Sequence, residues 1–188
     1  MAQTLQVSKQ KLAKPPLEIH TLGERVLRQG SKNVTSINDE VRRLAQQMLQ
    51  TMYSADGIGL AAPQVGVNKR LIVVDIDPEN SARPPLVLIN PQVKQASAEL
   101  AVDQEGCLSV PGVYADVRRS QKIIATYRDL SGKPMQIEAS GLLARCILHE
   151  IDHLDGVMFV DRVENQLDLT PKLQTKGFSV RDVQRVSS

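Results

Sequence analysis

The chain has 188 residues, 41% of them apolar and 23% charged, which is typical of one globular domain with a substantial core. A net charge of +2 is too small to indicate DNA binding, and 3% aromatic residues with no Trp disfavour modules that stack nucleic-acid bases. Two cysteines, no signal-peptide pattern and no apolar run near ~20 residues argue against a disulfide scaffold and a membrane protein. We expect a soluble protein of a reducing compartment.

The first part of the chain combines a polar terminus with one helical pattern. Residues 1–16 contain three lysines, no acid and no Arg, so we expect a disordered terminus rather than the alternative, a short organellar presequence. Residues 38–54 carry Val, Leu and Met at helical spacing, with Asn38 placed to cap the first turn and Gly57 placed to end the run. We therefore predict a helix there, with its Met and Leu side chains in the core.

Strands and a second helix are predicted further along the chain. Four stretches are typical of strands: residues 70–76, 85–93, 121–129 and 133–140. The second helix is predicted over residues 141–154, and Gly156 is its stop signal. The order of these elements predicts an α+β fold, a mixed and mostly antiparallel sheet with one helix before it and one after it.

The chain is divided into three parts on this basis. Residues 1–16 form the disordered terminus, and residues 17–165 form a single domain that contains every motif discussed below. Residues 166–188 are polar and carry an excess of basic side chains, so they are expected to form a weakly ordered tail.

The second predicted helix carries an H-E-x-x-H pattern. His149 and His153 are one turn apart and face the same way, so both imidazoles can bind one metal ion. Glu150 lies about 100° further round the helix, where it can act as a general base on water without binding the ion. The alternative is a surface helix that matches the pattern by chance, which the preceding apolar run and the terminal glycine disfavour.

A third metal ligand must come from elsewhere in the chain. Metzincins place a histidine where this chain has Phe159, which excludes that family. His20 is the remaining histidine and stays a weak candidate. Cys146 shares the helix face, but a ligand triplet on one straight helix spans about 11 Å, so Cys146 is better explained as a pocket-lining residue. Cys107, between Gly106 and Pro111, is free to approach the helix and is the preferred ligand; a buried inert thiol is its alternative.

The segment from Gly57 to Gly66 is a candidate for the side of the site opposite the metal. Gly57 and Gly59 let the backbone approach a substrate closely, and Gln64 offers an amide N–H that can stabilise an oxyanion. The glycines fit neither a phosphate loop nor a dinucleotide-binding fingerprint. A tight turn between helix and strand is an equally good explanation from these residues alone.

Three stretches, GIGLAAPQ, EGCLS and HEIDHLDG, resemble in order and spacing the three motifs of the peptide deformylases. The similarity covers about residues 17–162, and SVPGVYADV resembles the branch shared by bacteria and plant organelles. It implies an α+β fold whose sheet wraps around the metal-binding helix. It also implies a bacterial cytoplasmic location, with an organellar stroma or matrix as the alternative. One departure is Leu148, where the family usually has Gln, and we expect it to alter packing or metal retention rather than the reaction.

The resemblance also implies roles for individual residues. The metal, natively Fe²⁺ with Zn²⁺, Ni²⁺ or Co²⁺ as substitutes, would be held by Cys107, His149 and His153. Glu150 would be the general acid/base, and the Gln64 side chain and the Leu108 backbone N–H would stabilise the oxyanion. The pocket for a methionine side chain would be lined by Ile58, Gly59, Leu142 and Cys146.

The implied reaction is removal of the N-formyl group from the initiator methionine of a nascent chain, with release of formate. Two alternatives are a metallopeptidase that cuts internal peptide bonds and a scaffold protein with a closed, structural four-ligand metal site. A weaker hypothesis concerns the basic tail, which could steer the protein to the RNA-rich ribosome; a merely solvated tail is its alternative.

Overall fold

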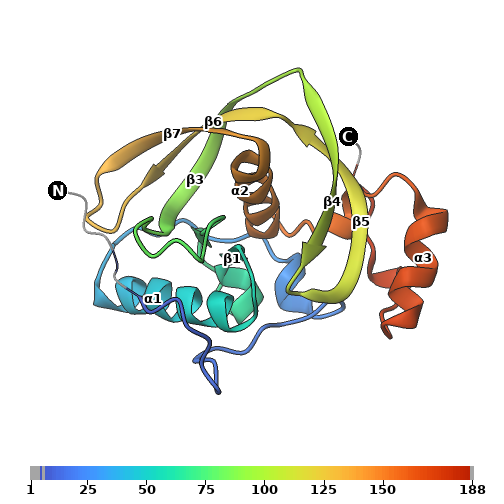
Figure 1. Ribbon diagram of the computed structural model, residues 1–188, viewed down its shortest axis with the longest axis horizontal. Coiled ribbons are helices and arrows are strands. Elements are labelled where there is room, and N and C mark those ends of the chain that lie inside the picture. Colours follow the sequence, from blue (N-terminus) through green and yellow to red (C-terminus); the bar gives the residue numbers. More distant parts are fainter. Residues whose placement is uncertain (1–4, 6, 187–188) are drawn as a thin grey trace.

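The computed structural model describes residue 5 and residues 7–186, and its strands and helices surround one central helix (Figure 1). The α-helices are α1 (Asp39–Ser54), α2 (Gly141–Leu154) and α3 (Gln166–Thr175). The strands are β1 (Gly59–Ala61), β2 (Leu71–Val74), β3 (Leu86–Ala96), β4 (Leu100–Cys107), β5 (Val110–Ser120), β6 (Lys122–Arg128) and β7 (Pro134–Ser140). Short 3₁₀ turns are η1 (Arg25–Arg28), η2 (Ala62–Val65), η3 (Phe159–Arg162) and η4 (Val180–Asp182).

The strands form two antiparallel sheets, which confirms the α+β prediction. One sheet has the order β1-β2-β3-β6-β7, and β4 pairs with β5 in a separate two-stranded sheet. The sequence predicted a sheet that mixes parallel and antiparallel pairs. Among the described residues the one parallel pairing is an isolated bridge between Lys32 and Lys69. The sequence analysis did not predict β4 and β5 as a hairpin, because the Gly and Pro residues around Cys107 indicated either a loop or a strand end; Cys107 is the last residue of β4.

Helix α1 begins and ends close to the predicted residues. The Asn38 side chain accepts a hydrogen bond from the Val41 N–H, and Asp39 and Glu40 in the first turn favour the positive end of the helix dipole. Its apolar face is fully buried: Met48, Leu49 and Met52 are 0% exposed. The helix packs against β1 and β2, so it supports the strand that borders the site.

Helix α2 occupies the centre of the molecule and spans the predicted residues 141–154 (Figure 1). It contacts strands of both sheets, β1, β2 and β7 on one side and β5 on the other. Gly141 is its first residue and Gly156 follows its end, with φ values of +57° and +76°, a region that favours glycine. Because α2 is enclosed, even its charged residues Glu150 and Asp152 are buried. None of the described helices is long and apolar enough to span a bilayer.

Both ends of the chain are more ordered than the sequence analysis predicted. The tail expected after residue 165 instead forms α3, whose Leu169 and Leu173 are 0% exposed and join a core cluster with Val113 and Val117 of β5. Two leucines spaced one turn apart are a weak helical signal, and the polar residues around them led to the prediction of a weakly ordered tail.

The predicted disordered terminus makes specific contacts in its described part, although residues 1–4 and 6 lie outside the described residues. The Lys9 ammonium donates to the carbonyls of Asn80 and Arg83 at 2.9 Å and pairs at 2.7 Å with the buried Asp75 carboxylate. The Tyr53 hydroxyl donates to the same carboxylate at 2.8 Å. The terminus is thus held by a buried acid rather than by secondary structure.

Candidate metal centre and active site

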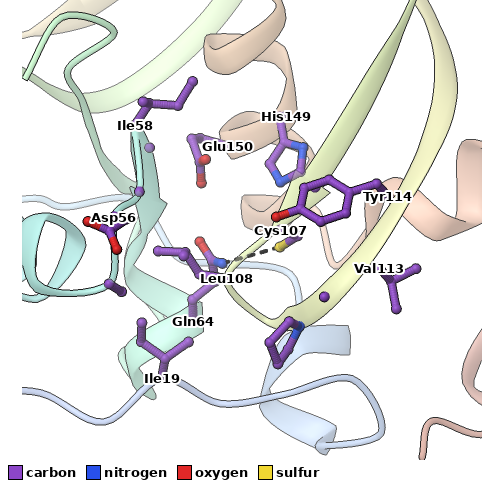
Figure 2. Close-up of a pocket in the computed structure, with 16 residues that line it drawn as sticks. Ile19, Asp56, Ile58, Gln64, Cys107, Leu108, Val113, Tyr114, His149 and Glu150 are labelled. Atoms are coloured by element: carbon purple, nitrogen blue, oxygen red, sulfur yellow. Dashed lines mark hydrogen bonds between the residues drawn. The ribbon is translucent and has the colours of Figure 1, made fainter. Parts of the chain in front are cut away.

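A cavity of about 660 Å³ opens between the two sheets at the side of α2 (Figure 2). One wall comes from the segment that links α1 to β1 and from η2, the opposite wall from the β4–β5 hairpin, and the back from α2. Each of the three motifs singled out in the sequence supplies one of these parts. The residues that they contribute include Gly59, Gln64, Cys107, His149 and Glu150.

Cys107, His149 and His153 meet at the back of this cavity. Their ligand atoms lie within 4.8 Å of one another, and Cys107 Sγ is 3.3 Å from His153 Nε2. Ligands around a tetrahedral ion lie roughly 3.4–3.8 Å apart for metal–ligand bonds of about 2.0–2.3 Å. The three atoms could therefore hold one ion with little movement.

The residues considered as other ligands lie elsewhere. Cys146 is not part of the group; burial raises the pKa of its thiol well above the usual value, and its Sγ faces the Ile58 carbonyl at 3.5 Å. His20 contacts Glu24 at 2.6 Å instead, so its weak candidacy as third ligand is wrong. The closed four-ligand site of the scaffold hypothesis is consequently not formed by these residues.

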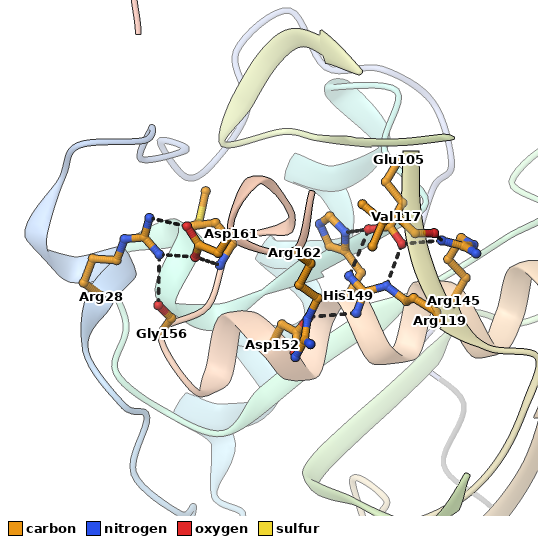
Figure 3. A network of polar contacts seen from close by, with 11 residues as sticks. Arg28, Glu105, Val117, Arg119, Arg145, His149, Asp152, Gly156, Asp161 and Arg162 are labelled. Atoms are coloured by element: carbon orange, nitrogen blue, oxygen red, sulfur yellow. Dashed lines mark hydrogen bonds and ion pairs between the residues drawn. The ribbon is translucent and has the colours of Figure 1, made fainter. Parts of the chain in front are cut away.

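A buried ionic network orients His149 (Figure 3). Its Nδ1 faces Glu105 Oε2 at 2.8 Å, so Nε2 is directed to the ligand group. Arg119 binds the Glu105 carboxylate through two nitrogens at 2.6 and 2.9 Å, Arg145 binds it at 2.7 Å, and Arg119 also binds Asp152 at 2.7 Å. Burial alone would raise the pKa of Glu105, but the hydrogen bonds from Arg119 and His149 outweigh it and lower the pKa. Glu105 is therefore an anion at neutral pH.

Phe159, the residue that excluded the metzincins, has a structural role at the same imidazole. Its ring stacks on the His149 ring with a centroid separation of 6.0 Å and an interplanar angle of 24°. It is 1% exposed, so it holds one face of the imidazole in the core. The residue at the position of the third metzincin histidine therefore packs against His149 and does not join the Cys-His-His group.

Glu150 lies beside the ligand group with its carboxylate in the cavity (Figure 2). It is 4% exposed, and within the described part of the chain its Oε2 has no hydrogen-bond partner. Burial raises its pKa to about 7, while the nearby His149 acts in the opposite direction. A carboxyl group with this pKa can both accept and donate a proton near neutral pH.

Gln64 lies on η2, in the wall that faces the β4–β5 hairpin, and its amide group is held in one orientation. Its Oε1 accepts from the Ala61 N–H at 2.8 Å, so its Nε2 is directed toward Ser109 Oγ at 3.1 Å and Cys107 Sγ at 3.5 Å. The Gln64 side chain is thus a fixed donor beside the ligand group. Leu108 follows Cys107 at the end of β4 and lines the same cavity.

Comparison with known proteins identifies the family. The model of the family described as polypeptide deformylase matches residues 16–168. The chain is 79% identical over 184 residues to Peptide deformylase 2 of Gloeobacter violaceus, with 98% of both chains covered. The chain belongs to the peptide deformylase family. It is also 59% identical over 187 residues to the peptide deformylase of a Picosynechococcus species, with 100% of both chains covered.

Solved structures of deformylases have the same fold. The crystal structure of a peptide deformylase from Synechococcus elongatus in complex with actinonin matches with a TM-score of 0.96 and 59% identity, over 97% of this chain and 99% of that chain. A plant peptide deformylase matches with a TM-score of 0.80 and 37% identity, over 89% and 90% of the two chains. The chain is therefore an enzyme of the deformylase class, and the metallopeptidase alternative is not favoured.

The residues assigned to the methionine pocket of this deformylase lie in different environments. Ile58 and Gly59 line the cavity. Cys146 is buried behind Gly59, where a Cβ on that glycine would come within 2.7 Å of the sulfur. Leu142, in the first turn of α2, is 52% exposed and does not line the cavity. Its role in substrate binding remains a prediction.

Leu148 is partly buried and packs against the core cluster around α2. It also lines a separate cavity of about 250 Å³ together with Arg119 and Asp152 of the ionic network. The departure from the family pattern thus lies beside the groups that orient His149, and not in the catalytic cavity.

Sequence reasoning missed two residues of this deformylase's site. Glu105 stands two residues before Cys107, and a carboxylate so close to a predicted ligand was the available signal for a partner of a metal-binding histidine. Tyr114 lines the cavity mouth from β5 with 56% exposure, and its ring covers the backbone of Gly106 beside Cys107. Nothing in the sequence indicated that contact, because it depends on the register that pairs Gly106 with Tyr114.

Proposed function

We propose that this deformylase hydrolyses the N-formyl group of the N-formylmethionine that begins nascent proteins, giving formate and a free amine. The observation that carries the proposal is that one cavity combines a Cys-His-His ligand group, a buried carboxyl group without a partner and an oriented amide donor. We assign the catalytic unit to residues 17–165, which contain all of these groups. The protein would act in the bacterial cytoplasm, an assignment supported by its cyanobacterial relatives.

We further propose Fe²⁺ as the native ion, with Zn²⁺, Ni²⁺ or Co²⁺ as functional substitutes, held by Cys107, His149 and His153. One thiolate and two imidazoles suit all four of these ions. This ligand set therefore supports each ion as a candidate but does not favour one over another. When bound, such an ion supplies Lewis acidity and makes a water molecule more acidic. Glu105, through the His149 Nδ1, would keep the imidazole in the tautomer that binds metal.

Glu150 is proposed as the general acid/base of the reaction. It would take a proton from the attacking water while the oxygen forms a bond to the formyl carbon. When the carbon–nitrogen bond breaks, the same carboxyl group would return the proton to the leaving amine. The pKa of about 7 suits this exchange, because neither direction of proton transfer is strongly opposed at neutral pH.

Gln64 and the backbone N–H of Leu108 are proposed to stabilise the negative charge that develops on the formyl oxygen. The hydrogen bond from Ala61 supports this role for Gln64, since it fixes the side of the amide that carries the N–H groups. Because the formyl carbon bears only hydrogen, a tight cavity at the metal would reject an acetyl group by size.

The first residue of the substrate would lie between β1 and the β4–β5 hairpin. We propose that its side chain is bound near Ile58, Gly59, Cys146 and Leu142 and that its backbone pairs with β1. β1 is an end strand of the five-stranded sheet, which supports pairing of an extended peptide along its open edge.

The test is anaerobic purification with metal analysis, coupled to a formate-release assay on formyl-Met-Ala. We expect about one ion per chain, and Glu150→Ala or Cys107→Ala should abolish most of the turnover. Undiminished formate release in either variant would overturn the assignment. Cleavage of unformylated peptides by the intact protein would instead support the metallopeptidase.

A ribosome contact through the basic residues beyond 166 is a second proposal, supported by Lys172, Lys176, Arg181 and Arg185 against few acids. Because α3 contributes to the core, substitution of these residues by Gln is a cleaner test than deletion. Unchanged, salt-insensitive binding of the substituted protein to ribosomes would end the idea.

A further inference from the structure

A second groove, of about 450 Å³, lies beside the catalytic cavity between the β4–β5 hairpin and α3. Gly112 and Tyr114 of the hairpin line both hollows, so the two adjoin along this part of β5. The far side of the groove belongs to α3, the helix that the sequence analysis did not predict. A peptide chain that leaves the cavity over Gly112 and Tyr114 therefore enters a groove walled by α3. Figure 1 shows α3 beside β5.

The side chain of Lys176 lies over the hairpin at the border between the two hollows. A Cβ built on Gly112 would be 2.8 Å from Lys176 Cε and 3.1 Å from its Nζ, so the absence of a side chain at Gly112 makes room for the lysine. Gly112 has a φ of +78°, which also favours glycine at this position. The ammonium group is thus placed against the rim of the catalytic cavity.

The charged side chains that line the groove are two lysines, Lys172 and Lys176. Lys172 pairs with Asp168 at 2.6 Å. Lys176 forms no ion pair with any residue that the structure describes. Asp116, the acid that follows Tyr114 on the outer face of β5, is not among the lining residues. An anionic group in the groove would therefore face one uncompensated ammonium.

We propose that Lys176 and the adjoining groove form a subsite for a carboxylate of the formylated peptide, downstream of its first residue. The inference rests on the proposed function, since it takes the first residue to occupy the catalytic cavity. The carboxylate could come from an acidic side chain or from the C-terminus of a short peptide. In both cases the recognised group is the same, an anion within reach of the Lys176 ammonium.

The test is a series of C-terminally amidated formyl-Met pentapeptides in which a single Glu is moved from position 2 to position 5, with Gln at the same position as reference. Formate release is measured at low ionic strength, without ribosomes. We expect Glu to raise kcat/KM about two- to five-fold over Gln at one or two positions, because exposed ion pairs are weak. The preference should fall toward unity in about 0.5 M salt, which screens exposed charges.

Variants separate the subsite from a general charge effect. Lys176→Ala should lose the Glu preference, Lys176→Arg should keep it, and Lys176→Glu should prefer Lys over Gln at the same position. Lys94→Ala, which removes an exposed lysine on β3, is the matched control and should keep the preference. A Glu-to-Gln ratio that is the same in the parent and in Lys176→Ala would overturn the proposal.

Two further arms complete the experiment. Peptides with a free C-terminus identify the source of the anion. If the parent protein prefers the free acid over the amidated peptide, and Lys176→Ala loses this preference, the subsite is supported and its ligand is the terminal carboxylate. Formate release from the amidated peptide without charged residues tests the proposed deformylase reaction separately from the charge preference. Absence of formate release from this peptide by the metal-loaded parent protein would count against the deformylase reaction and not against the charge selectivity.

Discussion

Substitution of Gly59 by Ala tests whether the position of the Glu150 carboxylate controls the reaction. A Cβ on Gly59 would overlap Glu150 Oε1 and would lie 2.7 Å from Cys146 Sγ, where ordinary contacts begin at 3.4 Å. The carboxylate must therefore move by about 1 Å, a misplacement that costs on the order of 10²-fold in rate. Gly59 does not have a positive φ, so the new methyl group acts through its volume and not through backbone strain.

The cost in stability should be of the same order as the loss of transition-state stabilisation, since a 10²-fold fall in rate corresponds to about 2.7 kcal/mol. The Glu150 side chain can rotate away, whereas the Cys146 sulfur is fixed in α2, so overpacking should cost about 1–3 kcal/mol. The assay is formate release from formyl-Met-Ala together with urea unfolding and metal analysis. We expect kcat to fall about 10²-fold while the metal content stays that of the parent, since the three atoms nearest the new methyl group belong to Glu150 and Cys146 and not to the Cys-His-His group.

The matched control for this experiment is Gly30→Ala. Gly30 is exposed, has no positive φ, and a Cβ there would meet nothing within 4 Å. It should leave both rate and stability unchanged. If Gly59→Ala retained kcat/KM within about threefold of the parent, the requirement that Glu150 hold its position would be refuted.

Three further outcomes are expected. Gln64→Ala should lower kcat by about 10²–10³-fold with little change in metal content, as measured by formate release and metal analysis; a change below threefold would remove Gln64 from the oxyanion site. Leu169→Ala should cost about 2–5 kcal/mol in the free energy of unfolding, whereas Leu167→Ala, at a 91% exposed position of the same helix, should cost less than about 0.5 kcal/mol; equal values would mean that α3 does not contribute to the core. Lys9→Ala should cost about 1–3 kcal/mol in urea unfolding because it leaves a buried carboxylate unpaired, whereas Lys11→Ala breaks an exposed pair and should have almost no effect; similar losses in the two variants would contradict this explanation.

The helices and most of the large sheet were predictable because their signals are local. In α1 and α2 the apolar spacing, the Asn38 cap and the stop at Gly156 lie within one or two turns of the residues that they organise. The β4–β5 hairpin and α3 were missed for a common reason. In both, a few buried residues pack against a distant segment, and the local sequence is dominated by polar residues, Gly and Pro.

The order of the N-terminus depended on a contact that no local pattern contains. Lys9 is held by Asp75, far along the chain, and the fold buries that carboxylate, which also accepts a hydrogen bond from Tyr53. A lysine in a polar stretch gives no sign of such a partner, so composition alone predicted disorder.

The sequence by itself predicted which side chains could form the candidate metal centre. Helical geometry fixes His149, Glu150 and His153 relative to one another, and the weakness of the other candidates favours Cys107 as the third ligand. Only the tertiary structure decided the surroundings: Glu105 behind His149, and Gly59 against the Glu150 carboxylate. The physical reason is that ligand type and helical spacing are properties of short segments, whereas orientation, burial and charge compensation arise where separate strands and helices pack together.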